Sequence, residues 1–138
     1  MGLRYGTEAG TPVAYGDGFE RGGVRFSLHS AGHVLGSAQV LMEYQGERVV
    51  VTGDYKRRPD PTCAPFALVP CDIFITEATF GLPVFQHPPI AGEIAKIFAR
   101  LEAEPDSSIL VGAYALGKAQ RVIAELRRAG WDKPIYLH

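Results

Sequence analysis

The stretch from residue 38 to residue 52, AQVLMEYQGERVVVT, decides what kind of fold the first half of the chain has. Two runs of β-forming residues, Ala38 to Tyr44 and Arg48 to Thr52, flank the short linker Gln45-Gly46. Two such runs around a short glycine-containing linker are typical of a β-hairpin. We therefore expect an antiparallel hairpin here.

The residues on either side extend this pattern. Upstream, Thr11 to Tyr15 and Val24 to His29 have the composition of short strands, separated by Gly16-Asp17-Gly18 and Gly22-Gly23, which favour turns. Downstream, Asp54 to Pro70 contains four prolines and predicts an ordered loop. The first half of the chain is therefore expected to be antiparallel β-structure.

The second half alternates between apolar runs and amphipathic segments. Continuous apolar runs favour strands buried on both faces, and apolar residues at helical spacing favour helices. The expected order is a strand at Cys71 to Thr76, a helix at Ile90 to Glu104 after Pro88-Pro89, a strand at Ser108 to Tyr114, a helix at Lys118 to Ala129 before Gly130, and a strand opening at Pro134 to His138. The fold class is α/β, with the order β-α-β-α-β in this half.

The composition is that of a soluble globular domain. Hydrophobic residues make up 46% of the chain and charged residues 21%, which argues against disorder. No apolar run approaches the roughly 18 residues of a membrane span, and the N-terminus lacks a signal-peptide pattern. We expect a cytoplasmic protein that does not contact a membrane. Cys63 and Cys71 fit no zinc-knuckle spacing and receive no role.

The charge distribution leaves nucleic-acid binding open. The net charge is −1, so no overall basic field is present. Basic residues gather locally in two sets, either of which could be solvated surface or a phosphate-binding patch. These sets are Lys56, Arg57 and Arg58, and Lys118, Arg121, Arg127 and Arg128.

A histidine in a glycine-bounded loop is the sharpest chemical feature. The stretch from residue 30 to residue 39, SAGHVLGSAQ, places His33 between Gly32 and Gly36. Glycines at these positions permit tight turns and the close approach of a ligand. Neutral imidazole is the commonest protein ligand of zinc. A single loop histidine is more often structural, so both interpretations stay open.

Two acids follow apolar strands in the same way. Asp54 follows the run VVVTG, and Glu77 follows CDIFIT. A carboxylate at a strand end is a frequent way to hold a metal or a catalytic water, but an isolated Gly-Asp is also a common turn or capping element. The composition alone does not show whether these acids converge on His33.

Four sequence blocks in order resemble one family. AGHVLGSAQV, VTGDYKRRPDPTC, FITEATFGLP and AYALGKAQRVIAEL are similar to the β-CASP nucleases of the metallo-β-lactamase superfamily, in particular the bacterial DNA-ligase-associated exonucleases, which are related to mRNA 3′-end-processing nucleases. The resemblance implies a partial metallo-β-lactamase (αββα) fold that runs into the start of a β-CASP insert. Residues 1–80 would be the C-terminal part of the metallo-β-lactamase-like half, and residues 81–138 would be the start of the β-CASP-like α/β segment.

The resemblance also implies roles for individual residues. His33 would be a zinc ligand, and Asp54 would be a catalytic carboxylate that bridges two metals. Glu77 would be the first acidic motif of the β-CASP type, which orients a histidine across the cleft; Ala78 departs from the serine that the family tends to have there. Two zinc ions would be the cofactor of the complete enzyme. Nucleic acid would contact three basic residues, namely Lys56, Arg57 and Lys118.

One departure from the family is large. Its principal metal motif, His-x-His-x-Asp-His, is absent from these 138 residues, and His29 and His87 match no family ligand. His138 ends the family-like string PIYLH before the downstream histidine motifs. Zinc in catalytic sites normally has three protein ligands. We therefore expect a fragment that binds zinc weakly or not at all and is inactive alone.

The most favoured function is metal-dependent hydrolysis of phosphodiester bonds in DNA, with RNA as the second candidate substrate. By family association a DNA ligase would be a partner, and the apolar strands would promote a homo-oligomer. Two alternatives stay open. The first is a nonenzymatic remnant or interaction module that keeps the core of the fold. The second is a metallo-hydrolase of small molecules; the TFGLP and AYALGKAQ blocks argue against this second alternative.

Overall fold

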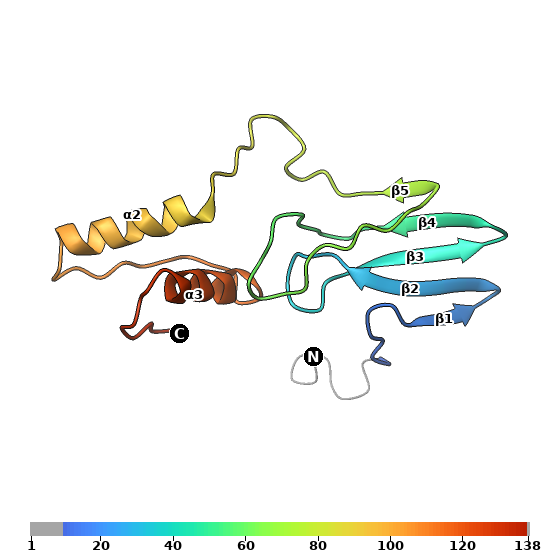
Figure 1. Ribbon diagram of the computed structural model, residues 1–138, viewed down its shortest axis with the longest axis horizontal. Helices are drawn as coiled ribbons and strands as arrows, with labels where there is room; N and C mark the ends of the chain where they lie inside the picture. Colours follow the sequence, from blue (N-terminus) through green and yellow to red (C-terminus); the bar gives the residue numbers. More distant parts are fainter. Residues whose placement is uncertain (1–9, 138) are drawn as a thin grey trace.

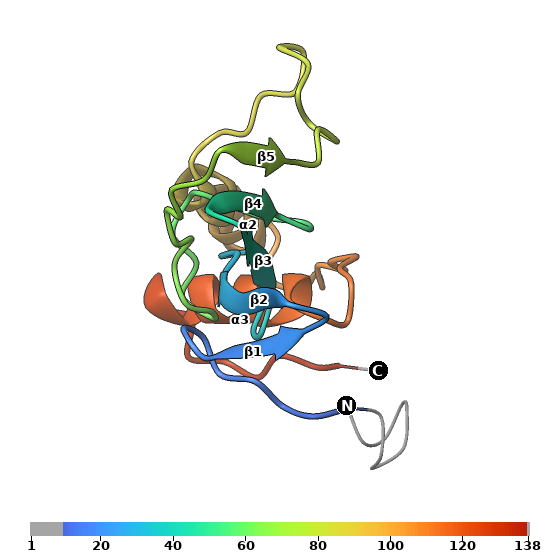
Figure 2. The same ribbon diagram turned by 90° about the vertical axis from the view of Figure 1, so that its right-hand side faces the viewer.

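The computed structural model describes residues 10–137. Within that range the chain forms a five-stranded sheet and two helices, so the expected α/β class is confirmed. Figure 1 shows the helices beyond one end of the strands, and Figure 2, which looks along that direction, agrees. The elements are β1 (Gly18–Arg21), β2 (Val24–Ser30), β3 (Ala38–Tyr44), β4 (Glu47–Val51), β5 (Ile73–Ile75), α2 (Ile90–Ala103) and α3 (Lys118–Arg128).

The sheet is antiparallel from β1 to β4 and has the strand order β1-β2-β3-β4-β5. The expected hairpin is confirmed: Tyr44 pairs with Glu47 across the turn. Gln45 and Gly46 both have positive φ, 50° and 88°. Two central residues with positive φ match the twist of the flanking strands and are typical of type I′ turns. The local sequence therefore determines the register of this pair.

The core is small and centred on β3 and β4. Leu41 and Val50 are opposite each other in the β3–β4 register and are 3% and 0% exposed. Two polar side chains, Gln39 and Thr52, are also fully buried at the ends of these strands. A separate contact joins α2 to the segment after α3, where the rings of Phe98 and Trp131 stack with centroids 5.8 Å apart. Burial is therefore concentrated in the hairpin.

Both expected helices are present and end as the sequence indicates. The segment after α3 turns at Gly130, whose φ is 97°. The amide of Gly130 donates to the carbonyl of Arg127 at 3.1 Å, and the amide of Trp131 donates to the carbonyl of Leu126 at 3.0 Å. These two bonds form a Schellman motif, which satisfies carbonyls left free at the end of the helix.

The strand expected at Thr11 to Tyr15 is not present. Pro12 lacks an amide donor within that run, and Gly16 turns the chain with a φ of 84°. The first strand begins instead at Gly18, which pairs with Ser27. The glycines that favoured a turn therefore belong partly to the strand itself.

The strand expected at Cys71 to Thr76 is shorter and more exposed than its apolar run indicated. Only Ile73 to Ile75 pair, parallel to β4, and their side chains are 50%, 48% and 52% exposed. β5 is an edge strand, and neither helix covers its faces (Figure 1). An apolar run is buried on both faces only where other elements supply the covering surfaces.

The strands expected at Ser108 to Tyr114 and at Pro134 onward are also absent from the range that the structure describes. Leu110 is 99% exposed and Tyr136 90% exposed. Neither segment has a described strand beside it to complete backbone hydrogen bonds, so its β-forming residues remain irregular. The β-α-β-α-β order is therefore not observed, and His138 lies outside the described residues.

No helix within residues 10–137 is long and apolar enough to span a membrane.

Candidate metal centre

Strand direction brings the candidate residues to one end of the sheet. β2 ends at Ser30, β4 at Val51 and β5 at Ile75, and all three run toward the helices (Figure 1). The loops that follow these strands therefore lie at the same end. His33 is in the first loop, Asp54 in the second and Glu77 in the third.

His33 and Asp54 are close neighbours. Nε2 of His33 lies 4.0 Å from Oδ2 of Asp54, and their side chains are 31% and 75% exposed. Hydrogen bonds from the backbone amide and hydroxyl of Thr79 lower the pKa of Glu77, and the charge of His33 lowers it further. The amide of Thr79 donates to Oε2 of Glu77 at 2.7 Å. The three residues singled out from the sequence thus lie within electrostatic reach of one another.

The loop that carries His33 is shaped by Ser37. Its hydroxyl accepts hydrogen bonds from the amides of His33 and Val34 at 3.0 and 3.1 Å. Its carbonyl accepts from the amide of Ala31 and from the hydroxyl of Tyr15, at 3.0 and 2.8 Å. A short polar residue closing a glycine-containing loop is a common turn device. The serine directly after the second loop glycine is therefore the sequence signal by which Ser37 could have been recognised.

Gly32 permits the neighbouring loop to approach His33. Its φ is 68°, and a Cβ atom there would lie 2.4 Å from the carbonyl oxygen of Lys56 and 2.8 Å from the amide nitrogen of Phe66. A side chain is thus excluded by space as well as by backbone conformation. The amide of Lys56 donates to the carbonyl of Ala31 at 2.9 Å. The backbone just after Asp54 is therefore packed directly on the backbone beside His33.

Gln39 joins the start of the His33 loop to the segment around Ala67 by hydrogen bonds. Its Nε2 donates to the carbonyls of Ser30 and Ala67, at 3.0 and 2.7 Å. The hydroxyl of Ser30 donates to the carbonyl of Ala64 at 3.0 Å, and the amide of Ala67 donates to the carbonyl of Ser30 at 3.0 Å. These partners are distant in the sequence, so no local pattern could have identified them.

Asp60 is a buried carboxylate between the two halves. Its side chain is 3% exposed, forms an ion pair with Lys56, and lies 3.5 Å from Nε of Arg121 in α3. Burial would raise its pKa, but hydrogen bonds from Lys56 and Thr62 outweigh this effect and lower the pKa overall. Nearby, burial and the charge of Asp60 raise the pKa of the Cys63 thiol. Asp60 was not recognised from the sequence.

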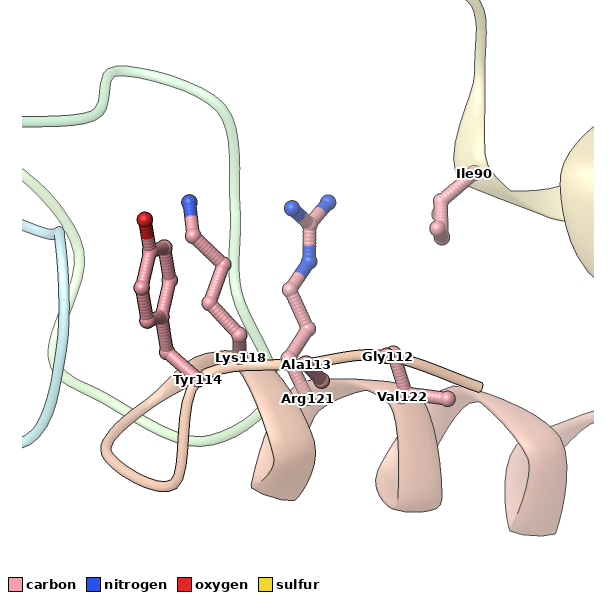
Figure 3. A pocket seen from close by; sticks show the side chains of 7 residues that line it. All are labelled: Ile90, Gly112, Ala113, Tyr114, Lys118, Arg121 and Val122. Carbon is pink, nitrogen blue, oxygen red and sulfur yellow. The ribbon is translucent and has the colours of Figure 1, made fainter. Parts of the chain in front are cut away.

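The basic residues have different environments. Lys56 is paired with Asp60, and Arg58 donates to the carbonyl of His87 at 2.5 Å, whereas Arg57 is exposed. Lys118 is exposed and lines a hollow of about 460 Å³ between the start of α2 and α3. Figure 3 shows that the side chains of Tyr114, Lys118 and Arg121 extend in the same direction there.

The remaining histidines of the described range make structural contacts. Nε2 of His29 lies 3.0 Å from the hydroxyl of Ser27, and the ring of His87 meets the ring of Phe80 edge to face. Among residues 10–137 no group of three or more His, Cys, Asp or Glu side chains could hold a metal. His33 and Asp54 carry donor types that zinc takes, an imidazole nitrogen and a carboxylate oxygen, and these two atoms lie 4.0 Å apart.

Comparisons with known proteins give consistent results, although no family model matches. The chain is 37% identical over 117 residues to a "Probable DNA ligase" of Opitutus terrae, 33% over 115 residues to "Endoribonuclease YSH1" of Eremothecium gossypii, and 30% over 118 residues to "Cleavage and polyadenylation specificity factor 73" of Drosophila melanogaster. The matches cover 81%, 80% and 84% of this chain. The chain spans 11%, 15% and 17% of these relatives.

The matched region includes most of the chain and agrees with the four-block resemblance in its sequence. The chain is 30% and 33% identical to the two RNA-processing relatives and 37% identical to a segment of the probable ligase, each over more than 110 residues. The chain is therefore homologous to a segment of the β-CASP nucleases of the metallo-β-lactamase superfamily, at 30% to 37% identity over about four fifths of its own length.

Proposed function

We propose that this chain is part of a metal-dependent nuclease that hydrolyses phosphodiester bonds in DNA. The observation that carries the proposal is the approach of His33 Nε2 to Asp54 Oδ2, 4.0 Å apart, at the sheet end where Glu77 also lies. In this proposal residues 1–80 belong to a metallo-β-lactamase-like half, and residues 81–138 begin a β-CASP-like segment. The homology to nucleases supports both statements.

His33 and Asp54 would hold zinc, together with ligands from polypeptide outside this segment. Bound zinc would lower the pKa of a water molecule and stabilise charge on a phosphate oxygen. Asp54 would also be the carboxylate shared with a second zinc ion. The exposure of both side chains supports their access to further ligands. Two donors alone hold zinc weakly, so we propose that the 138-residue chain is inactive by itself.

Glu77 would act as a hydrogen-bond acceptor that fixes an imidazole. The hydrogen bonds from Thr79 lower the pKa of the Glu77 carboxyl below its ordinary value, so the ionised form that accepts hydrogen bonds is favoured. An ionised carboxylate that accepts a ring N–H selects the tautomer and orientation of that ring. The partner histidine would come from outside the described residues.

Arg57 and Lys118 are the basic residues that we propose contact the nucleic-acid backbone. Both are exposed, whereas the charge of Lys56 is already balanced by Asp60. Tyr114, beside Lys118 in the hollow (Figure 3), would stack on a base. The segment of a "Probable DNA ligase" that is 37% identical supports DNA as the substrate and joint action with a ligase. The endoribonuclease relatives make RNA the second candidate.

The test uses the full-length polypeptide that contains this chain, loaded with zinc, and labelled single-stranded DNA, double-stranded DNA and RNA. We expect cleavage of DNA that a chelator abolishes. Asp54→Ala should reduce kcat at least about 1,000-fold, because a metal-bridging carboxylate is lost. Asp106→Ala makes the same change at an exposed aspartate in a turn and is the matched control.

Other outcomes separate the alternatives. Zinc binding without cleavage of any nucleic acid would contradict the nuclease proposal and favour an interaction module. Turnover of a small lactam or ester without nucleic-acid cleavage would favour a small-molecule hydrolase. Preferred cleavage of RNA would overturn the choice of DNA alone.

A further inference from the structure

We infer that Asp60 is a positioning residue that clamps the loop beginning at Asp54 between the His33 loop and α3, and so fixes the Asp54 carboxylate relative to His33. The inference rests on the proposed function for its consequence, but its geometry is independent of it. None of the proposed metal-site roles involves Asp60.

The Asp60 carboxylate contacts several partners at once. Oδ1 of Asp60 accepts from the amide and the hydroxyl of Thr62, at 2.9 and 2.6 Å. Oδ2 pairs with Lys56 and lies 3.5 Å from Nε of Arg121. With its side chain 3% exposed, Asp60 meets little solvent. A buried carboxylate is stable in this position only while such partners remain.

Lys56 links Asp60 to the candidate metal centre. Lys56 is two residues after Asp54, and its amide donates to the carbonyl of Ala31 at 2.9 Å. Its own carbonyl oxygen lies against Gly32, where there is no room even for a Cβ atom. Holding the Lys56 side chain therefore holds the backbone that joins Asp54 to the residues next to His33.

Arg121 links Asp60 to the other side of the His33 loop. Arg121 is in the second turn of α3, and Gly117, just before α3, packs so closely on Val34 that a Cβ atom would lie 2.1 Å from Cγ1 of Val34. Nε of Arg121 is buried and has no hydrogen-bond partner in the described part of the chain, so Asp60 is the carboxylate that balances it. Helix and loop thus enclose residues 31–34.

The consequence is geometric. Metal ligands must be held to within about 0.5 Å to bind and act productively. Asp54 itself is 75% exposed in its side chain, and no hydrogen bond within residues 10–137 fixes its carboxylate. Its position therefore depends on the backbone that Asp60 secures. Removal of the Asp60 charge leaves two half-buried cations close together, and their repulsion would push Lys56 away from Arg121.

The experiment compares Asp60→Asn with Asp106→Asn in the full-length protein. We expect the amide of Lys56 to exchange with solvent at least about tenfold faster in Asp60→Asn, because its bond to Ala31 opens more often. We expect the Kd for zinc to rise about tenfold or more. kcat on a DNA oligonucleotide should fall about 10- to 100-fold with KM within twofold, because ligand geometry changes while the two residues proposed to contact the backbone, Arg57 and Lys118, are retained.

Arg121→Gln provides a second test in case Asp60→Asn does not fold. It should give the same direction of change in Lys56 amide exchange and in kcat, and Arg121→Lys should restore part of both. The inference is overturned if a folded Asp60→Asn or Arg121→Gln protein has unchanged Lys56 amide exchange, zinc Kd and kcat. In that case an active wild-type protein would still support the proposed function. A wild type that neither binds zinc nor cleaves would overturn the proposed function and the positioning role together, whereas faster Lys56 exchange would still show the clamp.

Discussion

The hairpin of β3 and β4 and the segment from Ser108 to Tyr114 are both rich in apolar, β-forming residues, yet only the hairpin forms strands. The two hairpin strands pair across a two-residue turn, and Leu41 and Val50, which lie opposite each other in them, are buried. Ser108 to Tyr114 has no strand beside it among residues 10–137, and Leu110 is 99% exposed. The same composition therefore gives a strand only where a partner for its backbone lies within reach.

The same difference governs the loops. The loop around His33 is held from both sides by backbone bonds, by Ser37 and by the segment that follows Asp54. The hollow near Tyr114 and Lys118 lies open between α2 and α3 (Figure 3). We therefore expect changes in the strand half to cost far more than comparable changes in the helical half.

The largest expected effect is at Gly32. Gly32→Ala should destabilise the protein by about 4 kcal/mol, because it combines backbone strain at a positive φ with a clash against the Lys56 carbonyl. Gly36→Ala has a similar φ of 80° but open space, and should cost about 1 kcal/mol. Urea unfolding measures both. Equal losses would show that the close packing of the two loops does not exist in solution.

The next prediction compares two leucines. Leu41→Ala should cost about 3 kcal/mol, because Leu41 is 3% exposed in the core. Leu110→Ala should change stability by less than about 0.5 kcal/mol, since its side chain is 99% exposed. Thermal denaturation of the two variants decides. A loss above about 1 kcal/mol for Leu110→Ala would mean that this segment is covered in solution.

A smaller effect is expected from acidification. The pKa of Asp60 is lowered in the folded chain from its ordinary value of 3.8. The unfolded state therefore binds this proton more readily, so Asp60 stabilises the fold fully above pH 3.8 and progressively less as the pH falls through its folded pKa. Urea midpoints measured between pH 6 and pH 2 should fall more steeply at the acidic end for the wild type than for Asp60→Asn. Parallel curves would contradict the ion pairing of Asp60.

The smallest effect concerns association. The exposed apolar side chains of β5 and of residues 110–114 favour self-association, since uncovered strand edges and apolar patches promote pairing. We expect the apparent mass of the 138-residue chain to decrease on tenfold dilution in light scattering. Leu110→Ser should weaken this association with no loss of stability. A monomeric mass at every concentration would exclude the homo-oligomer.

Features that depend on neighbours in the sequence were predictable. The hairpin turn at Gln45-Gly46, the helix from Ile90 and the end of α3 at Gly130 follow from turn and helix signals within a few residues. Strand length and burial for Cys71 to Thr76 were predicted wrongly, because both depend on which elements cover the sheet. The sequence indicates an apolar run and says nothing of what lies against it.

The candidate site divides in the same way. His33, Asp54 and Glu77 were identified from their positions after apolar strands and from the resemblance to a family. Gln39 and Arg121 were not identified in these roles, because Ala67 and Asp60, their respective partners, become neighbours only when the sheet and α3 are in place. Asp60 has local partners in Lys56 and Thr62, but its link to α3 depends on the same packing.

By itself the sequence determined the β3–β4 hairpin and the two helices, because these depend on local backbone preferences, and it indicated His33, Asp54 and Glu77 as candidates by side-chain type and position. Only the tertiary structure decided that Nε2 of His33 and Oδ2 of Asp54 lie 4.0 Å apart and that Asp60 joins their loops to α3. Both facts depend on strand direction and on charges paired across the fold. The pair of Asp60 and Arg121 forms only where packing of the loop against α3 takes both groups largely out of water, which no sequence pattern encodes locally.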